Sequence, residues 1–387
     1  MKDLIVKEIE ALKDALISTS DYICSNPEMG NQEFKAMEKL TSLLAAHGFS
    51  IEKNIVNKPT AFRAVYDSAK TGPSVAYLCE YDALPEIGHG CGHNMIGTMS
   101  TGAAIALSKI LNQIGGRVVV LGTPAEETDG AKVDMAEQGI FDDIDVAMIL
   151  HPDDKNHESG LSLAMDAIQF DFRGKTSHAA SAPHEGINAL DAVILTFTGI
   201  NALRQHITPD ARIHGIIKEG GQAANIVPDR AIAQFYVRAG KKKYLKELVE
   251  KVKNIAKGAA LMTGAALDIS NYEISYDDMN TNKTLSESFT ANLKYLGVAD
   301  IHPARSSYGS IDMGNVSNKV PAIHPYISIS DAPLVAHTVE FRDATKSEKA
   351  HWALIKGASS LALTGYDILT DKKLLNKVKE EFKNSIG

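Results

Sequence analysis

The stretch SVAYLCEYDALPEIGHGCGH, residues 74–93, decides the fold of this chain. Its first part, Ser74–Glu80, is an apolar run typical of a strand that is covered on both faces. Its last part, Gly88–His93, places a thiol and two imidazoles within five residues, on a backbone that glycine allows to bend sharply. Cysteine thiolate and neutral imidazole are ligands that zinc prefers. The stretch predicts a buried strand leading into a metal-binding loop, with a chance Cys/His cluster as the alternative.

Composition and charge restrict the class of protein. The chain has 387 residues, 44% hydrophobic and 23% charged, as in a globular protein long enough for two domains. Its net charge of −8 argues against nucleic acid or an anionic membrane as the main partner, because either needs a basic face. The sequence shows no signal segment, no apolar run long enough to span a bilayer, and an odd number of cysteines, three. We therefore expect a soluble, cytoplasmic protein with reduced thiols.

Two further apolar runs are also followed by chemically active residues. Arg117–Leu121 precedes Glu126 and Glu127, and Val146–Leu150 precedes His151. The helices expected between these strands give the sheet parallel character, so the carboxyl ends of the strands meet at one edge. We expect the Cys/His loop, the two glutamates and His151 to converge there. A solvated loop is the alternative interpretation of the adjacent glutamates.

The pattern of elements changes near residue 167. The next 110 or so residues read strand, helix, two strands, helix and strand, which is the ferredoxin-like βαββαβ order. We expect residues 167–276 to form a second domain inserted into an α/β domain that comprises residues 1–166 and 277–387. Further elements predicted from periodicity are two helices within residues 1–46, helices at 94–111, 131–138, 186–206, 241–263 and 372–384, and strands at 61–66, 167–173, 212–218, 231–238 and 266–274.

Seven stretches carry a family resemblance in a fixed order along the chain. They are CEYDALPEIGHGCGHN (79–94), GTPAEETDGAK (122–132), ILHP (149–152), FRGKTSHAASAPHEGINALDAV (172–193), GGQAANIVPDRA (220–231), SIDMGNVS (310–317) and AHTVEF (336–341). Together they resemble the dinuclear-zinc aminoacylase and glutamate carboxypeptidase family, in particular its amidohydrolase branch of aminobenzoyl-glutamate hydrolases and aminoacylase-1-like dipeptidases. The resemblance implies a zinc-exopeptidase-like catalytic domain with a central, partly parallel sheet, and an inserted lid and dimerisation domain.

The resemblance also implies a set of metal ligands and catalytic groups. The implied ligands are Cys91, His93, Glu127, His151 and His337. Glu126 would be the general base and acid, and Asp82 would orient a ligand. The chain departs from the family where Glu80 replaces the histidine of a His-x-Asp-x-x-Pro motif, and where Asn94 replaces an aspartate and removes a negative charge. We expect one or two zinc ions, with manganese as an alternative.

The insertion contributes further candidates. His178 resembles a histidine that crosses a dimer interface to polarise the scissile carbonyl, with a loop histidine capping the next helix as the alternative and His184 as a weaker claimant. Asn225 and Arg238 are expected to contact a substrate carboxylate, although Arg238 also fits an exposed charge. His89 is expected to be loop structure or a substrate contact. The histidines expected to be structural or at the surface are His157, His302, His324 and His351.

The expected function is metal-assisted hydrolysis of the amide bond of an N-acyl or N-aroyl amino acid, aminobenzoyl-glutamate or a dipeptide, in a homodimer or larger homo-oligomer assembled through the insertion. Two other classes remain open. A hydrolase with Cys91 as nucleophile would leave the two glutamates, His151 and His337 without a role. A non-catalytic binding protein on the same fold would keep the pocket without turnover. A zinc oxidoreductase is disfavoured, because no Gly-x-Gly-x-x-Gly fingerprint follows a strand.

Overall fold

The structure is a computed structural model that describes residues 1–305 and 309–386. The chain forms two compact units. Of the described residues, unit 1 comprises Met1–Leu161, 279–305 and 312–386, and unit 2 comprises Ser162–Asp278 and 309–311. Among the described residues, none of the helices combines the length and the hydrophobicity needed to cross a lipid bilayer.

A six-stranded, partly parallel sheet forms the centre of unit 1. Its strands, in spatial order, are β1 (Ser50–Lys53), β2 (Phe62–Asp67), β4 (Arg117–Gly122), β3 (Ser74–Cys79), β5 (Val146–Met148) and β13 (Ala322–Ile323). Strand β3 is parallel to both β4 and β5, while β1, β2 and β4 pair antiparallel. Every residue of β3 is buried, as its continuous apolar run predicts. The expected fold class is thereby confirmed for this part of the chain.

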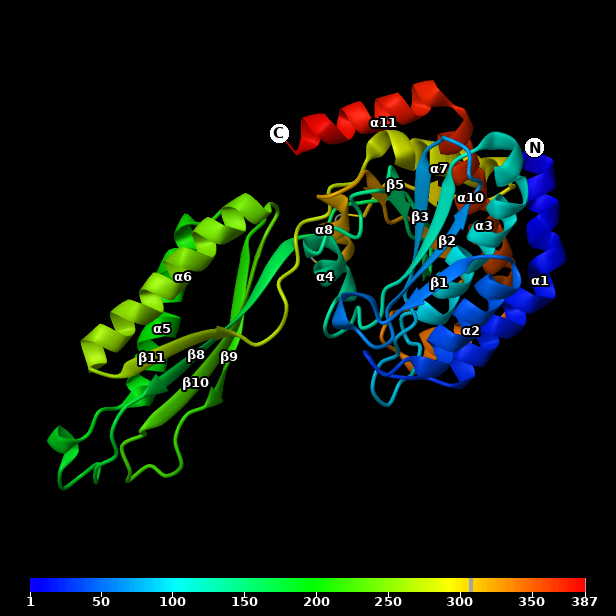
Figure 1. Ribbon diagram of the computed structural model, residues 1–387. Coiled ribbons are helices and arrows are strands. Elements are labelled where there is room, and N and C mark those ends of the chain that lie inside the picture. The colour runs from blue at the N-terminus through cyan, green and yellow to red at the C-terminus, as the bar shows by residue number, and fades with distance from the viewer. Residues whose placement is uncertain (306–308, 387) are drawn as a thin grey trace. The chain divides into compact units, whose positions relative to one another are not determined.

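Helix α3 (His93–Ile114) packs on β3 and β4 and is buried over most of its length. Its glycines, alanines and serines permit the close approach: Gly97, for example, lies against the carbonyl oxygen of Glu80. Helices α1 (Lys2–Ser25) and α10 (Glu348–Thr370) pack against α3 and against each other, and Figure 1 shows all three on the same side of the sheet.

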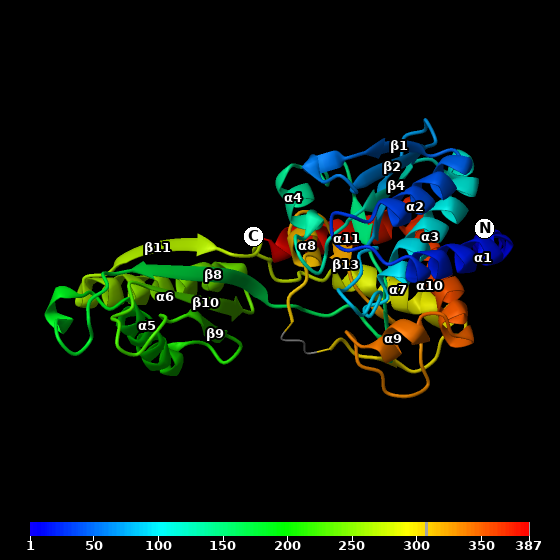
Figure 2. The ribbon, with the colours of Figure 1, turned by 90° about the horizontal axis from the view of Figure 1, so that it is seen from below.

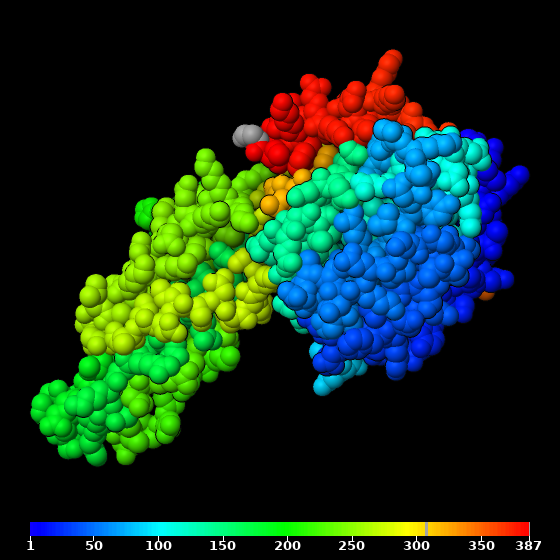
Figure 3. Space-filling model, viewed as in Figure 1, coloured from blue at the N-terminus to red at the C-terminus, as the bar shows by residue number. Residues whose placement is uncertain are grey.

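The remaining elements of unit 1 include further helices and a second sheet. The helices are α2 (Phe34–Ala46), α4 (Ala131–Glu137), α7 (Lys283–Tyr295), α8 (Met313–Ser317), α9 (Val339–Ala344) and α11 (Lys372–Ser385). A second, four-stranded sheet has the order β12 (Ile301–His302), β7 (Asn156–His157), β14 (Tyr326–Ser328) and β6 (His151–Asp153). Helices α4 and α8 lie side by side (Figures 1 and 2). Helix α11, red in Figure 3, lies next to the loop at residues 71–73, with which it lines a surface pocket.

Unit 2 has the expected βαββαβ order. Its elements are β8 (Ala164–Arg173), α5 (Ala189–Leu203), β9 (Arg212–Glu219), β10 (Arg230–Ala239), α6 (Lys242–Thr263) and β11 (Ala266–Asn271). The four strands form an antiparallel sheet in the order β11-β8-β10-β9. Helices α5 and α6 pack against each other, and they bury alternate residues of β10 such as Phe235 and Val237. The intervening residues of β10, Gln234, Tyr236 and Arg238, are only half-buried.

Some boundaries differ from those expected. The strand predicted to run to Leu150 ends at Met148, and His151 begins β6 in the second sheet. The first helix continues to Ser25, beyond the apolar stripe that predicts it. Both differences leave the candidate site residues at the edge where they are expected.

Candidate metal centre

The carboxyl ends of β3, β4 and β5 carry the metal-binding candidates, as the parallel arrangement predicts. Chain segments leaving β3 contain Asp82, Cys91 and His93, and the segment leaving β4 contains Glu127. The donor atoms of Cys91, His93 and Glu127 all lie within 4.8 Å of one another. The Cys91 thiol donates a hydrogen bond to Oε1 of Glu127 over 2.7 Å, and that oxygen lies 4.0 Å from Nε2 of His93.

Asp82 fixes the orientation of two of these residues. Its Oδ1 lies 2.9 Å from Nδ1 of His93, and its Oδ2 accepts the backbone N–H of Glu127 over 3.1 Å. With Nδ1 occupied, Nε2 of His93 is the nitrogen that faces Glu127. A carboxylate behind a ligating imidazole commonly selects its tautomer and raises its basicity.

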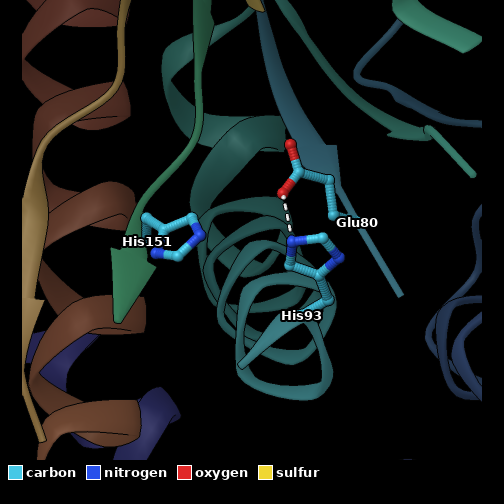
Figure 4. Close-up of side chains that lie close together, drawn as sticks. All are labelled: Glu80, His93 and His151. Atoms are coloured by element: carbon cyan, nitrogen blue, oxygen red, sulfur yellow. Dashed lines mark ion pairs between the residues drawn. The ribbon is translucent and has the colours of Figure 1, made fainter. Parts of the chain in front are cut away.

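His151 approaches from β6. Its Nδ1 donates to the carbonyl oxygen of Pro152 over 2.6 Å, so Nε2 is left to bind a cation. His151 forms a second compact donor group with His93 and Glu80, again within 4.8 Å (Figure 4). Burial, together with the neighbouring imidazoles of His324 and His93, lowers the pKa of His151 to about 3. The ring is therefore neutral near pH 7, as a metal ligand must be.

His337 reaches the cluster from the C-terminal part of unit 1. Its Nε2 lies 3.6 Å from Oε1 of Glu127, and its backbone N–H donates to the carbonyl oxygen of Gly90 over 2.9 Å. Its φ of +65° is in the left-handed region that non-glycine residues rarely occupy. Such backbone strain persists only where surrounding contacts fix it, and here the hydrogen bond to Gly90 holds the residue beside the Cys91 loop.

The separations among these donors suit zinc. A tetrahedral zinc ion with ligand distances of about 2.0–2.3 Å spaces its ligand atoms by about 3.3–3.8 Å. The His337–Glu127 distance of 3.6 Å and the Glu80–His93 distance of 3.5 Å fall in that range, and the His93–Glu127 distance of 4.0 Å is close to it. One thiol, three imidazoles and one carboxylate are also the donor types that zinc takes. The residues therefore fit a metal centre, and two partly separate donor groups leave room for two ions.

Glu126 lies among these groups, in the loop after β4. Burial raises its pKa well above the usual range, and the carboxylates of Glu80, Asp312 and Glu127 raise it further. Ala125, immediately before it, has a φ of +61°. The backbone N–H of Ala125 donates to the buried carboxylate of Glu33 over 2.9 Å, which anchors this strained loop.

The state of Cys91 bears on the alternative of a cysteine nucleophile. Burial raises the pKa of its thiol, and the charge of Glu127 raises it further. A nucleophilic cysteine needs the opposite shift, usually through a neighbouring imidazolium. The Cys91 thiol instead donates to the Glu127 carboxylate, whose negative charge opposes ionisation of the thiol. The geometry favours a thiol whose proton is displaced by a cation over a thiol that attacks substrate.

Two buried polar residues at the site, Lys132 and His324, were not predicted to lie there from the sequence. Lys132, at the start of α4, is fully buried, and its Nζ lies 2.7 Å from Oε1 of Glu80 and 2.6 Å from Oδ1 of Asp312. His324, expected to be structural or at the surface, is buried with its ring 5.5 Å from that of His151. The position of Glu80 in place of a family histidine is the one sequence signal that points here.

Two other residues near the loop have structural surroundings. Asn94 donates to the hydroxyl of Ser20 over 3.0 Å and so ties α3 to α1. His89 is buried, and burial, with the neighbouring His93, lowers its pKa to about 3. Among the described residues, neither of the two compact donor groups includes His89.

The candidates in unit 2 form two separate sets. His178 pairs with Ile226 in a β-bridge, and Ala179 donates to the carbonyl oxygen of Asn225, so the His178 and Asn225 loops are adjacent. The exposed His178 ring accepts backbone N–H groups of Ala180 and Ser181 at Nδ1, each over 3.2 Å. Arg238 lies at the other end of β10, where it donates to the hydroxyl of Ser310 over 2.9 Å. At about 3.3 Å per strand residue the two ends are roughly 25 Å apart, so one copy of unit 2 does not bring Arg238 and Asn225 together.

Comparisons with known proteins identify relatives of this chain. A family model described as a peptidase dimerisation domain matches residues 165–262. The chain is 38% identical to the mouse Xaa-Arg dipeptidase, over 99% of this chain and 92% of the relative, and 29% identical to a p-aminobenzoyl-glutamate hydrolase polypeptide from Escherichia coli, over 96% and 93%. Among solved structures, a dinuclear metal-binding peptidase of the M20 family from Bacillus subtilis superposes with a TM-score of 0.67 at 20% identity, over 92% of this chain and 98% of that one.

Proposed function

The chain belongs to the M20 family of metallopeptidases and amidohydrolases, and from that premise we propose that it hydrolyses the amide bond of dipeptides or similarly compact N-acyl amino acids. The observation that carries the proposal is the convergence of Cys91, His93, Glu127, His151 and His337 beside Glu126. Dipeptides with a C-terminal arginine are the first substrates to test, because the 38% identical mouse relative is named for them. Aminobenzoyl-glutamate is the second, from the more distant bacterial relative.

In the proposed mechanism the five ligands would hold one or two zinc ions, which would polarise the amide carbonyl and lower the pKa of water. Glu126 accepts the proton of the attacking water and donates it to the departing amine. Asp82 keeps Nε2 of His93 and the backbone of Glu127 aimed at the site. Because Nδ1 of His178 accepts two backbone N–H groups, its Nε2 is the nitrogen left to donate, which suits a group that stabilises an oxyanion.

A homodimer formed through unit 2 completes the proposal. The His178 and Asn225 loops lie at the end of the sheet remote from Ser162 and Asp278, where unit 2 joins unit 1. A second copy is therefore the proposed source of His178 and Asn225, while Arg238 lies at the end of the sheet where unit 2 joins unit 1.

A reducing, cytoplasmic setting belongs to the same proposal, since Cys91 must remain a free thiol to bind metal.

The decisive experiment combines Glu126→Gln with metal analysis. We expect the variant to keep its metal content and to lose about 10²–10⁴-fold in kcat on an Xaa-Arg dipeptide, because the proton transfer is removed while the ligands remain. Glu137→Gln, on the exposed side of α4, is the matched control and should retain full activity. Chelation should abolish hydrolysis and zinc should restore it.

Three results would contradict the proposal. Full turnover by Glu126→Gln with metal in place would exclude Glu126 as the base and favour a binding protein or another base. Activity that survives complete metal removal but is lost in Cys91→Ser would favour the cysteine nucleophile. Failure on all dipeptides, N-acetyl amino acids and aminobenzoyl-glutamate would exclude the proposed substrate class.

A further inference from the structure

Glu80 lies beside Nε2 of His93, whereas a carboxylate that only orients the ring would lie at Nδ1. It is buried immediately after β3, and its Oε2 lies 3.5 Å from Nε2 of His93. The supporting position behind His93, at Nδ1, is already filled by Asp82. A carboxylate beside Nε2 therefore faces the place where that nitrogen binds a cation, as Figure 4 shows with the ring of His151 opposite.

Lys132 holds the other oxygen of the same carboxylate. Its ammonium lies 2.7 Å from Oε1 of Glu80 and 2.6 Å from Oδ1 of Asp312, and all three side chains are almost completely buried. Two carboxylates and one ammonium leave this triad with a net charge of −1. A buried charge is costly unless it is compensated, and a cation between Glu80, His93 and His151 would compensate it.

We propose that Glu80 is an additional metal ligand, which binds through Oε2 and completes with His93 and His151 the coordination of one of two cations. Lys132 occupies Oε1 and restricts Glu80 to binding through one oxygen. The 3.5 Å separation of Oε2 and Nε2 agrees with the roughly 3.4 Å expected between two ligands of a tetrahedral zinc ion. The inference rests on the proposed function, because it assumes that the ligands described above bind metal.

The test measures metal binding rather than turnover. Wild type and Glu80→Gln are stripped of metal and titrated with Co²⁺, and the visible spectrum and the metal content after dialysis are recorded. We expect wild type to bind two ions per chain, and Glu80→Gln to bind one tightly while the other weakens at least 100-fold. The sulfur-to-cobalt charge-transfer band should persist in the variant, because Cys91 and Glu127 remain.

Two further variants separate ligation from charge. Asp312→Asn removes the other carboxylate on Lys132, which is not in either donor group, and should still bind two ions. Glu80→Gln/Lys132→Gln keeps the net charge of the triad at −1 and should show the same loss as Glu80→Gln. If the Glu80→Gln protein does not fold, the double variant serves as the test in its place.

The outcomes distinguish this proposal from the proposed function. Two tightly bound ions with an unchanged cobalt spectrum in Glu80→Gln, or in the charge-matched double variant, would overturn Glu80 as a ligand and leave the hydrolase intact. Equal weakening in Asp312→Asn and Glu80→Gln would assign the effect to charge alone and overturn it as well. A wild-type chain that binds no metal would remove both proposals together.

Discussion

Glu33 lies beneath the loop that carries Glu126 and Glu127. Its carboxylate accepts hydrogen bonds from the hydroxyl of Thr60, over 2.7 Å, and from the backbone N–H of Ala125, over 2.9 Å. Burial outweighs these hydrogen bonds and raises the pKa of Glu33 to about 7. The residue that anchors the loop of Glu126 and Glu127 therefore titrates near neutrality.

A raised pKa makes the stability of the fold depend on pH. The folded state binds the Glu33 proton more tightly than the unfolded chain, so the resulting stabilisation is complete below about pH 4.5 and is lost as the pH rises through 7. Relative to Glu33→Gln, which does not titrate, wild type should lose roughly 2–3 kcal/mol in free energy of unfolding between pH 5 and 8.5. Urea denaturation of both proteins at each pH measures the difference. Parallel pH profiles would show that Glu33 titrates normally.

Some residues of the candidate site could be predicted from the sequence, and others could not. Cys91, His93 and His337 lie in motifs whose residue types indicate metal binding, and the structure brings them together. Lys132 could not be recognised, because a lysine near the start of a helix is normally exposed. Only the packing of α4 against α8, 180 residues further along the chain, places it beside Asp312.

Among the elements, α3 links the fold to the site most directly. Gly92 is its N-cap, with a φ of +74°, and separates Cys91 from His93. A Cβ there would lie 2.4 Å from Cγ of Pro152, the residue after His151. The helix therefore begins at a position where only glycine fits both the backbone and the neighbouring strand.

Gly92→Ala should accordingly damage both stability and metal binding. We expect a loss of more than about 2 kcal/mol in free energy of unfolding, from the left-handed backbone and from the contact with Pro152, and reduced zinc content. Gly258→Ala is the control: Gly258 lies within α6, nothing lies near its Cβ position, and the change should stabilise unit 2 by about 0.5–1 kcal/mol. Thermal unfolding and metal analysis of both variants check this. A Gly92→Ala protein as stable and as metal-rich as wild type would refute it.

The long elements were predictable and the short ones were not. Apolar runs of five or more residues predict β3 and β4 closely, and alternation predicts β8 and β10. Strands β12 and β7 have two residues each and exist only because they pair across 145 positions of sequence, Ile301 with Asn156. No local pattern encodes such a pair, so the second sheet, which carries His151, was missed.

At the scale of the whole molecule, β9 is the strand through which we propose that two copies associate. It is the edge strand of the unit 2 sheet, and its exposed residues include Ile216 and Ile217, which point to opposite faces. Ile194 of α5 is exposed as well. An edge strand presents unpaired backbone groups, and the exposed isoleucines of β9 make this edge suited to pairing with a second copy.

Ile216→Lys should therefore convert a dimer into a monomer. Light scattering is expected to give about twice the chain mass of 41.7 kDa for wild type and the single mass for the variant. Leu261→Lys adds the same charge at another exposed position, on α6, and should leave the dimer intact. The monomer should also lose activity if His178 comes from the second copy. A monomeric wild type, or a dimeric Ile216→Lys protein, would contradict the proposed interface.

The position of His337 along the chain has a consequence for biosynthesis. Four of the five expected ligands precede unit 2, while His337 lies 59 residues after Asp278, where the main segment of unit 2 ends. Strand β13, which completes the main sheet, is also made late. During translation the first ligands emerge long before the last, so a nascent chain holds at most a partial set. Binding of metal by the complete set of ligands is thereby postponed until His337 has been synthesised and has left the ribosome.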